Sequence, residues 1–231
     1  GNGSANIATG LNSSSFGMSS SNDATGERAN ANGDSSYNSA YGSYADAHGN
    51  ASHNSAYGAY AYAFGDSSAN IASGYAASAA GNGAANAAYG YGAYATGVGS
   101  NNLALGSSAD ASGATSANLA LGLSAFSAGD GLANIAIGRN AAAGGTEGNA
   151  LGNVNALAIG DGAQAGATAA GQVNATAVGQ GATANAANAS AFGQGAKASA
   201  ENSVALGAGS VADEADTVSV GAVGSERRIV N

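Results

Sequence analysis

The chain has 231 residues, of which 39 are glycine and none is cysteine, proline or tryptophan. Only 8% are charged, against about a quarter in ordinary globular domains, and the hydrophobic residues are mostly small, so an interior of interdigitating large side chains is excluded. The net charge of −9 excludes a phosphate-neutralising patch and argues against nucleic acid or anionic membrane as a partner. No run of about 20 apolar residues is present, so direct membrane insertion of this chain is not expected.

A sixteen-residue period runs through residues 1–144. Counted from Gly1, glycine occupies positions one and ten, asparagine position six and alanine position eight of all nine units. The stretch "NLALG" at 102–106 returns unchanged at 118–122. Disorder usually accompanies high charge and proline, and neither is present. A period this short predicts an all-β protein in which each unit is one coil of a narrow parallel β-solenoid.

Within a unit, positions six to ten and twelve to fifteen alternate with the period of a strand, separated by glycine-rich turns. Positions six, eight, ten, thirteen and fifteen are always small or Asn, so we expect them inside. The Asn column is expected to form a ladder that bonds between coils and to turn backbone.

The period changes along the chain. Residues 1–144 form nine sixteen-residue repeats, and residues 145–174 are irregular, with a possible loop insertion that contains Glu147. Residues 175–216 form repeats of fourteen, in which Gly179, Gly193 and Gly207 mark the unit.

Positions seven and nine carry large apolar residues that cannot fit the thin interior. They form an apolar stripe on the outer face of a single solenoid, which marks an interface. Three copies around an axis would bury the stripes, so we expect a homotrimer. The residues assigned to this trimer interface are Leu103, Leu105, Leu119, Leu121, Ile135, Ile137, Leu157, Ile159, Val204, Leu206, Val218 and Val220.

All ten tyrosines lie between residues 37 and 94. Tyr44 and Tyr60 share position twelve, and Tyr62 and Tyr94 share position fourteen, both on the strand face expected to meet solvent. Tyr44 should stack over Tyr60 in the next coil. Outward aromatic rows are good anchors for a partner, so these four tyrosines are candidate ligand-binding residues.

No catalytic, cofactor-binding or metal site is expected. The two histidines, His48 and His53, are expected at exposed turn positions, because a metal site needs further ligands. Asp34, Asp66 and Asp130 recur at position two, where short carboxylates serve turn chemistry. There is no cysteine nucleophile and no phosphate-binding loop with its strand–turn–helix context.

Three C-terminal stretches resemble the Yersinia-adhesin (YadA-like) head of trimeric autotransporter adhesins. They are "ASAFGQGAKASAEN" (189–202), "NSVALGAGS" (202–210) and "TVSVGAVGSERRIVN" (217–231). The last resembles the start of the neck that joins head and stalk; its matching residues are Val218, Ser219, Val220, Gly221, Arg227, Arg228, Ile229 and Asn231. In this neck, Arg227 and Arg228 are expected to act as structural clamps that pair with Asp213, Glu214, Asp216 or a neighbouring chain.

The resemblance implies a left-handed parallel β-roll, a homotrimer, and an adhesin head on a bacterial surface fibre. It also implies an outer-membrane anchor beyond a C-terminal stalk, both missing from this sequence. The partners implied are extracellular matrix proteins such as collagen, fibronectin or laminin, cell-surface receptors or other surfaces. Asn202, Ser203 and Ser210 match a repeat linked to collagen binding in some members, with Leu206 in place of Ile, so they are also ligand-binding candidates. The sixteen-residue unit departs from the family's fourteen, so ligand choice is not carried over to residues 1–144.

Three other classes of β-solenoid compete with the adhesin. A glycan-binding solenoid could use the tyrosine rows without cleaving sugar. An ice-binding solenoid needs a regular outward Thr array, and the array that Thr9 and Thr25 begin is replaced by tyrosine from Tyr41 on. A polysaccharide-active enzyme needs an acidic groove, whereas the acids here are scattered in turns.

Overall fold

The computed structural model describes residues 3–131, 133–146 and 149–230, and these contain strands, turns and bends but no helix. The described ranges therefore offer no helix long and apolar enough to cross a membrane. The chain divides into two compact units, Gly1–Ala117 and Asn118–Asn231, which are considered separately. Glu147 and Asn231, which figured in the sequence predictions, lie outside the described residues.

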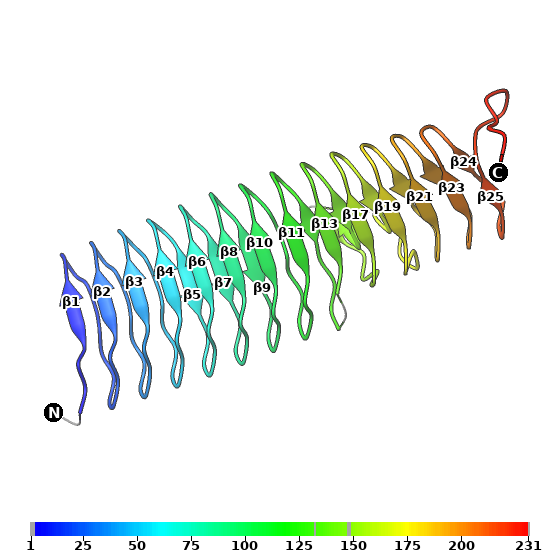
Figure 1. Ribbon diagram of the computed structural model, residues 1–231. Coiled ribbons are helices and arrows are strands. Elements are labelled where there is room, and N and C mark those ends of the chain that lie inside the picture. The colour runs from blue at the N-terminus through cyan, green and yellow to red at the C-terminus, as the bar shows by residue number, and fades with distance from the viewer. Residues whose placement is uncertain (1–2, 132, 147–148, 231) are drawn as a thin grey trace. The chain divides into compact units, whose positions relative to one another are not determined.

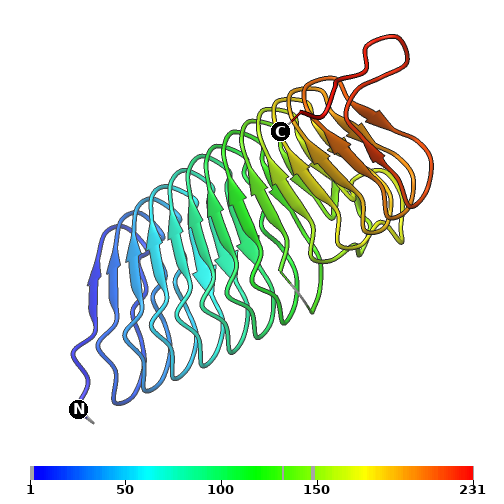
Figure 2. The same ribbon diagram turned by 45° about the vertical axis from the view of Figure 1, so that its right-hand side comes forward.

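In the first unit, each coil contributes one three-residue strand to a parallel sheet, the first sheet (Figures 1 and 2). Its order is β1-β2-β3-β4-β6-β8-β10, and each residue pairs with the residue sixteen positions on, as Ile7 does with Asp23. The strands are β1 (Ile7–Thr9), β2 (Asp23–Thr25), β3 (Ser39–Tyr41), β4 (Ser55–Tyr57), β6 (Ile71–Ser73), β8 (Ala87–Tyr89) and β10 (Leu103–Leu105). The all-β, parallel β-solenoid prediction is confirmed.

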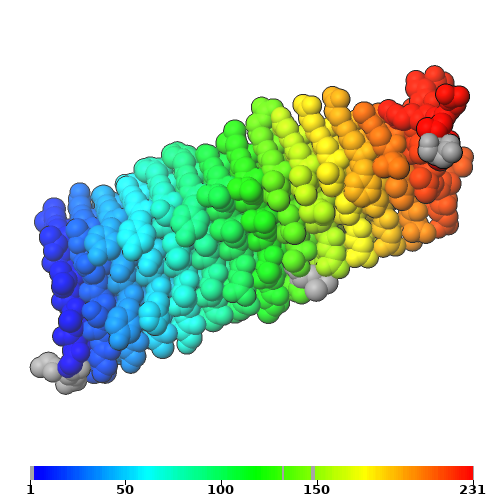
Figure 3. All heavy atoms as spheres, viewed as in Figure 1, coloured from blue at the N-terminus to red at the C-terminus, as the bar shows by residue number. Residues whose placement is uncertain are grey.

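The opposite side of each coil forms a second, shorter parallel sheet. It consists of β5 (Tyr62–Phe64), β7 (Ser78–Ala80) and β9 (Tyr94–Thr96), in that order. Isolated parallel bridges continue the same register, among them Asp46 with Tyr62 and Tyr94 with Asp110. Within residues 3–117 the space-filling view shows successive coils lying against one another (Figure 3).

Two glycine columns close the turns between the sheets. Gly26 has φ +138°, and a Cβ placed on it would lie 2.4 Å from the carbonyl oxygen of Gly42 in the next coil. At the other turn, a Cβ on Gly33 would lie 2.0 Å from the carbonyl oxygen of Gly49. No side chain fits at these distances, so the sixteen-residue coils of this unit can stack only where both columns are glycine.

Position twelve is a turn position and not a strand position, which corrects the sequence prediction. Tyr44 and Tyr60 occupy it with φ of +59° and +57°, the left-handed conformation that bulky residues rarely adopt. The second-sheet strand begins two residues later, at Tyr62 in the coil of Tyr60.

The interior is built from alanine. In the first sheet, the middle residue of each strand from β2 to β10 has no exposed surface, as for Ala24 and Ala40. Positions thirteen and fifteen, such as Ala45 and Ala47, are equally buried. The predicted inside face is confirmed for positions six, eight, thirteen and fifteen, but the position-ten glycines, such as Gly26 and Gly42, are only half-buried because they lie at the turn.

The predicted asparagine ladder is also confirmed. The Asn38 side-chain amide donates to the carbonyl oxygens of Asn32, at the end of the preceding unit, and Gly49, at the start of the next, both at 2.9 Å. Its Oδ1 accepts the backbone N–H of Asn54 at 3.0 Å and the hydroxyl of Ser52 at 2.9 Å. One side chain thus satisfies buried backbone groups of two turns that no strand reaches.

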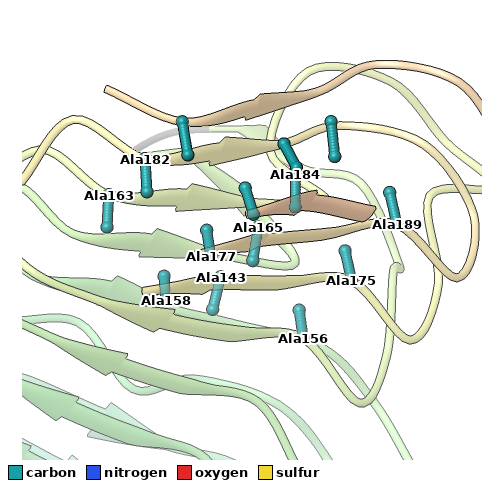
Figure 4. Packing of buried hydrophobic residues seen from close by; sticks show 14 of the residues in the cluster. Ala143, Ala156, Ala158, Ala163, Ala165, Ala175, Ala177, Ala182, Ala184 and Ala189 are labelled. Atoms are coloured by element: carbon teal, nitrogen blue, oxygen red, sulfur yellow. The ribbon is translucent and has the colours of Figure 1, made fainter. Parts of the chain in front are cut away.

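The second unit repeats the two-sheet plan. Its longer sheet has the order β11-β13-β17-β19-β21-β23-β25, formed by Leu119–Leu121, Ile135–Ile137, Leu157–Ile159, Thr176–Val178, Ser190–Phe192, Val204–Leu206 and Val218–Ser219. Its other sheet is β12-β14-β18-β20-β22-β24, formed by Phe126–Ser127, Ala142–Ala143, Gln164–Ala165, Thr183–Ala184, Lys197–Ala198 and Val211–Ala212. Figure 4 shows the alanines, among them Ala158 and Ala177, that point into the space between them.

The coil length changes inside this unit. Ile135 pairs with Leu157, 22 residues on, and Leu157 with Thr176, 19 residues on, before the step settles at 14 from Thr176 to Ser190. The first long coil carries an antiparallel hairpin, β15 (Gly145–Thr146) with β16 (Asn149–Ala150).

The second long coil is closed by Asn153. Its buried amide donates to the carbonyl oxygens of Gly166 and Ala169, both at 2.7 Å, and its Oδ1 accepts the N–H of Gln172 at 2.9 Å. The residues expected to be irregular therefore keep both sheets and extend only the turns.

Candidate functional site

The apolar stripe lies on the outer face of the longer sheet of each unit. Every residue assigned to the trimer interface is exposed or half-buried, and Leu105 leaves 45% of its surface to solvent. All of them lie in strands of these sheets except Val220, which directly follows β25. In the first unit this face changes character along the chain. Asp23, Ser39 and Tyr41 occupy it where later coils have leucine, so the part formed by β2 and β3 is polar and aromatic.

Tyr41 joins two coils on this polar part. Its hydroxyl donates to the carboxylate of Asp23 at 2.5 Å, and its ring stacks on Tyr57 with centroids 5.4 Å apart. The hydrogen bond to Asp23, together with partial burial, raises the pKa of Tyr41 to about 12. The hydroxyl therefore stays protonated well beyond the ordinary range of tyrosine.

A row of aromatic rings follows the turn between the two sheets of the first unit. Tyr44 stacks on Tyr60 at 5.0 Å between centroids, as predicted. Tyr60 meets Tyr75 edge-on at 5.7 Å, and Tyr75 stacks on Tyr91 at 5.2 Å. Arg28 covers the free face of Tyr44, with its Cζ 5.2 Å from the ring centroid and an N–H donated to the hydroxyl at 2.9 Å.

Sequence reasoning missed Tyr75 and Tyr91 as members of this row. They occupy position eleven, one residue before the position of Tyr44 and Tyr60. Both positions belong to the same tight turn, so a one-residue shift leaves the rings in one row. Assigning positions eleven and twelve to one turn would have placed all four rings in this row. The prediction of a strand from position twelve onward separated Tyr44 and Tyr60 from Tyr75 and Tyr91.

Tyr62 and Tyr94 lie apart from that row, on the outer face of the second sheet. They are 38% and 49% exposed, and neither stacks on another ring among the described residues. Ser78 of β7 pairs with both and stands between them. The four candidate tyrosines are therefore divided between two surfaces.

Both histidines take part in aromatic stacks. His53 stacks on Tyr37 at 5.0 Å between centroids, and His48 on Phe64 at 5.3 Å. His48 Nδ1 lies 2.7 Å from a carboxylate oxygen of Asp46, and this hydrogen bond raises the pKa of His48 against the opposing effect of burial. Within the described residues, no three His, Asp or Glu side chains are grouped so as to hold a metal ion.

The position-two residues form an exposed ladder that fits the predicted turn role. Asp34 Oδ1 accepts the N–H of Met18 at 2.8 Å, and Asp66 Oδ1 accepts that of Asn50 at 2.7 Å. Between them, Asn50 Oδ1 accepts the N–H of Asp34 at 2.9 Å. These side chains fasten one turn to the next.

Two of the three C-terminal ligand candidates are inaccessible. Ser203 and Ser210 are fully buried, and their hydroxyls donate to the carbonyl oxygens of Ala200 at 2.7 Å and Leu206 at 2.8 Å. A ligand on the surface of this chain cannot reach them, which corrects that part of the prediction. Asn202 is exposed, with φ +57°, and its amide donates to Asp216 at 2.5 Å.

Arg227 bonds to oxygen atoms of the preceding coil. Its guanidinium donates to the carbonyl oxygens of Ala208 at 2.6 Å and Val220 at 3.0 Å, and to the Ser210 hydroxyl at 3.0 Å. No ion pair joins Arg227 or Arg228 to Asp213, Glu214 or Asp216 among the described residues. Whether these arginines act as a clamp at a neck stays a prediction.

The structural class of this protein is therefore the parallel β-roll, built from short repeated coils with an alanine interior and one apolar outer face. The family model of the YadA head domain repeat matches residues 170–196, 184–210 and 198–222. These C-terminal coils are therefore YadA-like head repeats.

Among the solved structures that are similar to this chain is the collagen-binding domain of the Yersinia adhesin YadA, which is 20% identical, with a TM-score of 0.30, over 68% of this chain and 72% of that chain. A search of curated proteins finds no match.

Proposed function

We propose that this chain is the head of an adhesin on a bacterial surface fibre, a non-catalytic binding module that works as a homotrimer. The observation that carries the proposal is the exposed apolar face on the longer sheet. In the second unit it repeats as Leu119 and Leu121, Ile135 and Ile137, and Leu157 and Ile159. The YadA-like head repeats at residues 170–222 support the same assignment.

A trimer would remove the free-energy cost of exposing the apolar side chains of this face to water. Each solvent-facing leucine or isoleucine that becomes buried between copies gains about 25 cal/mol per Å² of apolar surface. An adhesin head needs a rigid rod with its remaining surface free for a partner. The partners we propose are extracellular matrix proteins such as collagen, fibronectin or laminin, or cell-surface receptors. Attachment to the outer membrane would be through further C-terminal segments.

Sedimentation equilibrium tests the assembly. We expect a mass near three times 21.4 kDa at all concentrations used. Leu121→Glu with Ile137→Glu should yield monomers, whereas Asp161→Asn, on a turn, should not. A folded monomer of the unchanged chain would contradict the trimer.

Binding of the trimer to immobilised collagen, fibronectin and laminin tests the adhesin function. Saturable binding to at least one of them is expected. A trimer that binds none of them, and no cultured cell surface, would contradict the proposed function.

A further inference from the structure

The row of residues at position fourteen has an unusual order in the first unit. Parallel pairing places Asp46, Tyr62, Ser78, Tyr94 and Asp110 side by side in five successive coils. Adjacent coils are about 4.8 Å apart, so the backbones of Tyr62 and Tyr94 are about 9.6 Å apart. The strands that carry them, β5 and β9, flank β7 (Figure 1).

Aromatic residues one coil apart stack directly on each other in this unit. Five such pairs have centroids between 5.0 and 5.4 Å apart and rings within 17° of parallel. Tyr62 and Tyr94 are two coils apart with the small Ser78 between them, so the backbone spacing leaves a gap for one further ring in the row. A flat group inserted there would lie about 4.8 Å from each ring, close to the spacing of the existing stacks.

The same solenoid shows which group fits over a tyrosine at this offset. Arg28 sits one coil before Tyr44, with its Cζ 5.2 Å from the ring centroid. A guanidinium over Ser78 would make that contact with two rings at once. Guanidinium groups are flat and weakly hydrated, and they stack on aromatic faces better than ammonium groups do.

Charge also favours a cation in the gap. Asp46 and Asp110 lie two coils from Ser78 on either side, and the whole chain carries a net charge of −9. At that distance the carboxylates cannot bond to a neutral ligand over Ser78, but they attract a positive one. Among the described residues the Ser78 hydroxyl has no side-chain hydrogen bond, so it is free to accept an N–H.

We propose that the gap between Tyr62 and Tyr94 binds an arginine side chain of a partner protein, inserted over Ser78. This proposal depends on the proposed adhesin function in one respect only: it assumes that the partner is a protein. A similar gap between Tyr57 and Tyr89, over Ser73, lies on the face of the first sheet that we propose to pack against other copies. It is therefore not expected to be open in the trimer.

Fluorine NMR of the trimer labelled with 3-fluorotyrosine tests the site. The probe is acetyl-arginine amide, with acetyl-lysine amide and methyl glucopyranoside as comparisons, and signals are assigned with single Tyr→Phe variants. We expect the Tyr62 and Tyr94 signals to shift saturably with a Kd on the order of 10 mM for the arginine probe. The lysine probe should bind several-fold more weakly, and the glucoside should cause no shift.

Two variants test separately whether binding requires the gap and whether it requires both tyrosine rings. Ser78→Tyr fills the gap with a third ring and should abolish binding while keeping both tyrosines. Tyr94→Ala should abolish it by removing one wall, and Tyr60→Ala, in the other aromatic row, should leave the Kd unchanged. Circular dichroism verifies that each variant is folded.

Three results would overturn the proposal: no saturable shift with the arginine probe, equal shifts of all tyrosines, or stronger binding of the glucoside, which would indicate a glycan site. Because the readout uses no matrix protein, a failure of matrix binding would overturn the proposed function and leave this result standing.

Discussion

The Oδ1 atom of Asn54 accepts the backbone N–H of Asn70, one coil further on, at 3.0 Å. The same side chain donates to the carbonyl oxygens of His48 and Gly65, both at 2.9 Å. Three segments of backbone in two coils thus depend on one buried amide. The asparagine column supplies, at a turn, the hydrogen bonds that a strand would otherwise supply.

Asn54→Ala should destabilise the solenoid by about 3 kcal/mol, because the buried N–H of Asn70 loses its acceptor and the carbonyl oxygens of His48 and Gly65 each lose one of their donors. Urea unfolding monitored by circular dichroism measures the change. Asn50→Ala is the matched control, since Asn50 belongs to the exposed position-two ladder and water can replace its bonds. A loss for Asn54→Ala no larger than that for Asn50→Ala would show that the ladder is not a main support.

Gly42→Ala should lower the free energy of unfolding by more than the strain of its turn conformation alone would. The added Cβ would lie 2.5 Å from the carbonyl oxygen of Gly58, so neighbouring coils must separate, and we expect a loss above about 3 kcal/mol. Gly83→Ala is the control, because Gly83 has φ +61° but open space around it, and about 1 kcal/mol is expected. Similar losses for the two variants would mean that conformation, and not close stacking, explains the glycine columns.

Tyr41 should ionise with a raised pKa of about 12, because its hydroxyl donates to the Asp23 carboxylate. The folded pKa is above the ordinary value of 10.0, so the Asp23 bond contributes stability that is complete below about pH 10 and is lost as pH rises towards 12. Ultraviolet titration of Tyr41→Phe against the unchanged chain identifies its transition. Asp23→Asn should move that transition towards 10, and an unmoved transition would contradict the assignment.

His48 should titrate above the ordinary histidine value of 6.5, since Asp46 stabilises its charged form. The pair contributes stability that is complete below about pH 6.5 and is lost as pH rises through the raised pKa. Carbon-bound proton shifts in NMR report the titration, and Asp46→Asn should lower the His48 pKa. A His48 titration that does not change in Asp46→Asn would contradict the assignment to this pair.

Much of the fold could be predicted from the sixteen-residue period of the sequence. Sixteen residues per coil and parallel stacking determine which residues are neighbours, so the pairing of Tyr41 with Tyr57 and the buried alanine column could be predicted. Position six could be assigned to a ladder because only a small amide fits a thin interior and also bonds to two turns.

The features that sequence reasoning missed depend on local backbone conformation. Tyr44 in a left-handed turn runs against the preference of a bulky residue, and alternation alone favoured a strand there. Stacking with Tyr60 and Arg28 accompanies that conformation. Ser203 and Ser210 were chosen by a motif that records residue types and not which side of a coil they face.

The strict glycine, asparagine and alanine columns leave the remaining positions under little constraint. A residue at position two, eleven, fourteen or sixteen can be exchanged without touching the interior, as Asp46, Tyr62 and Ser78 show within one row. Because each coil contacts only its neighbours, whole coils can also be duplicated or deleted without disturbing distant ones. Such a chain can change its surface residues while its backbone stays the same.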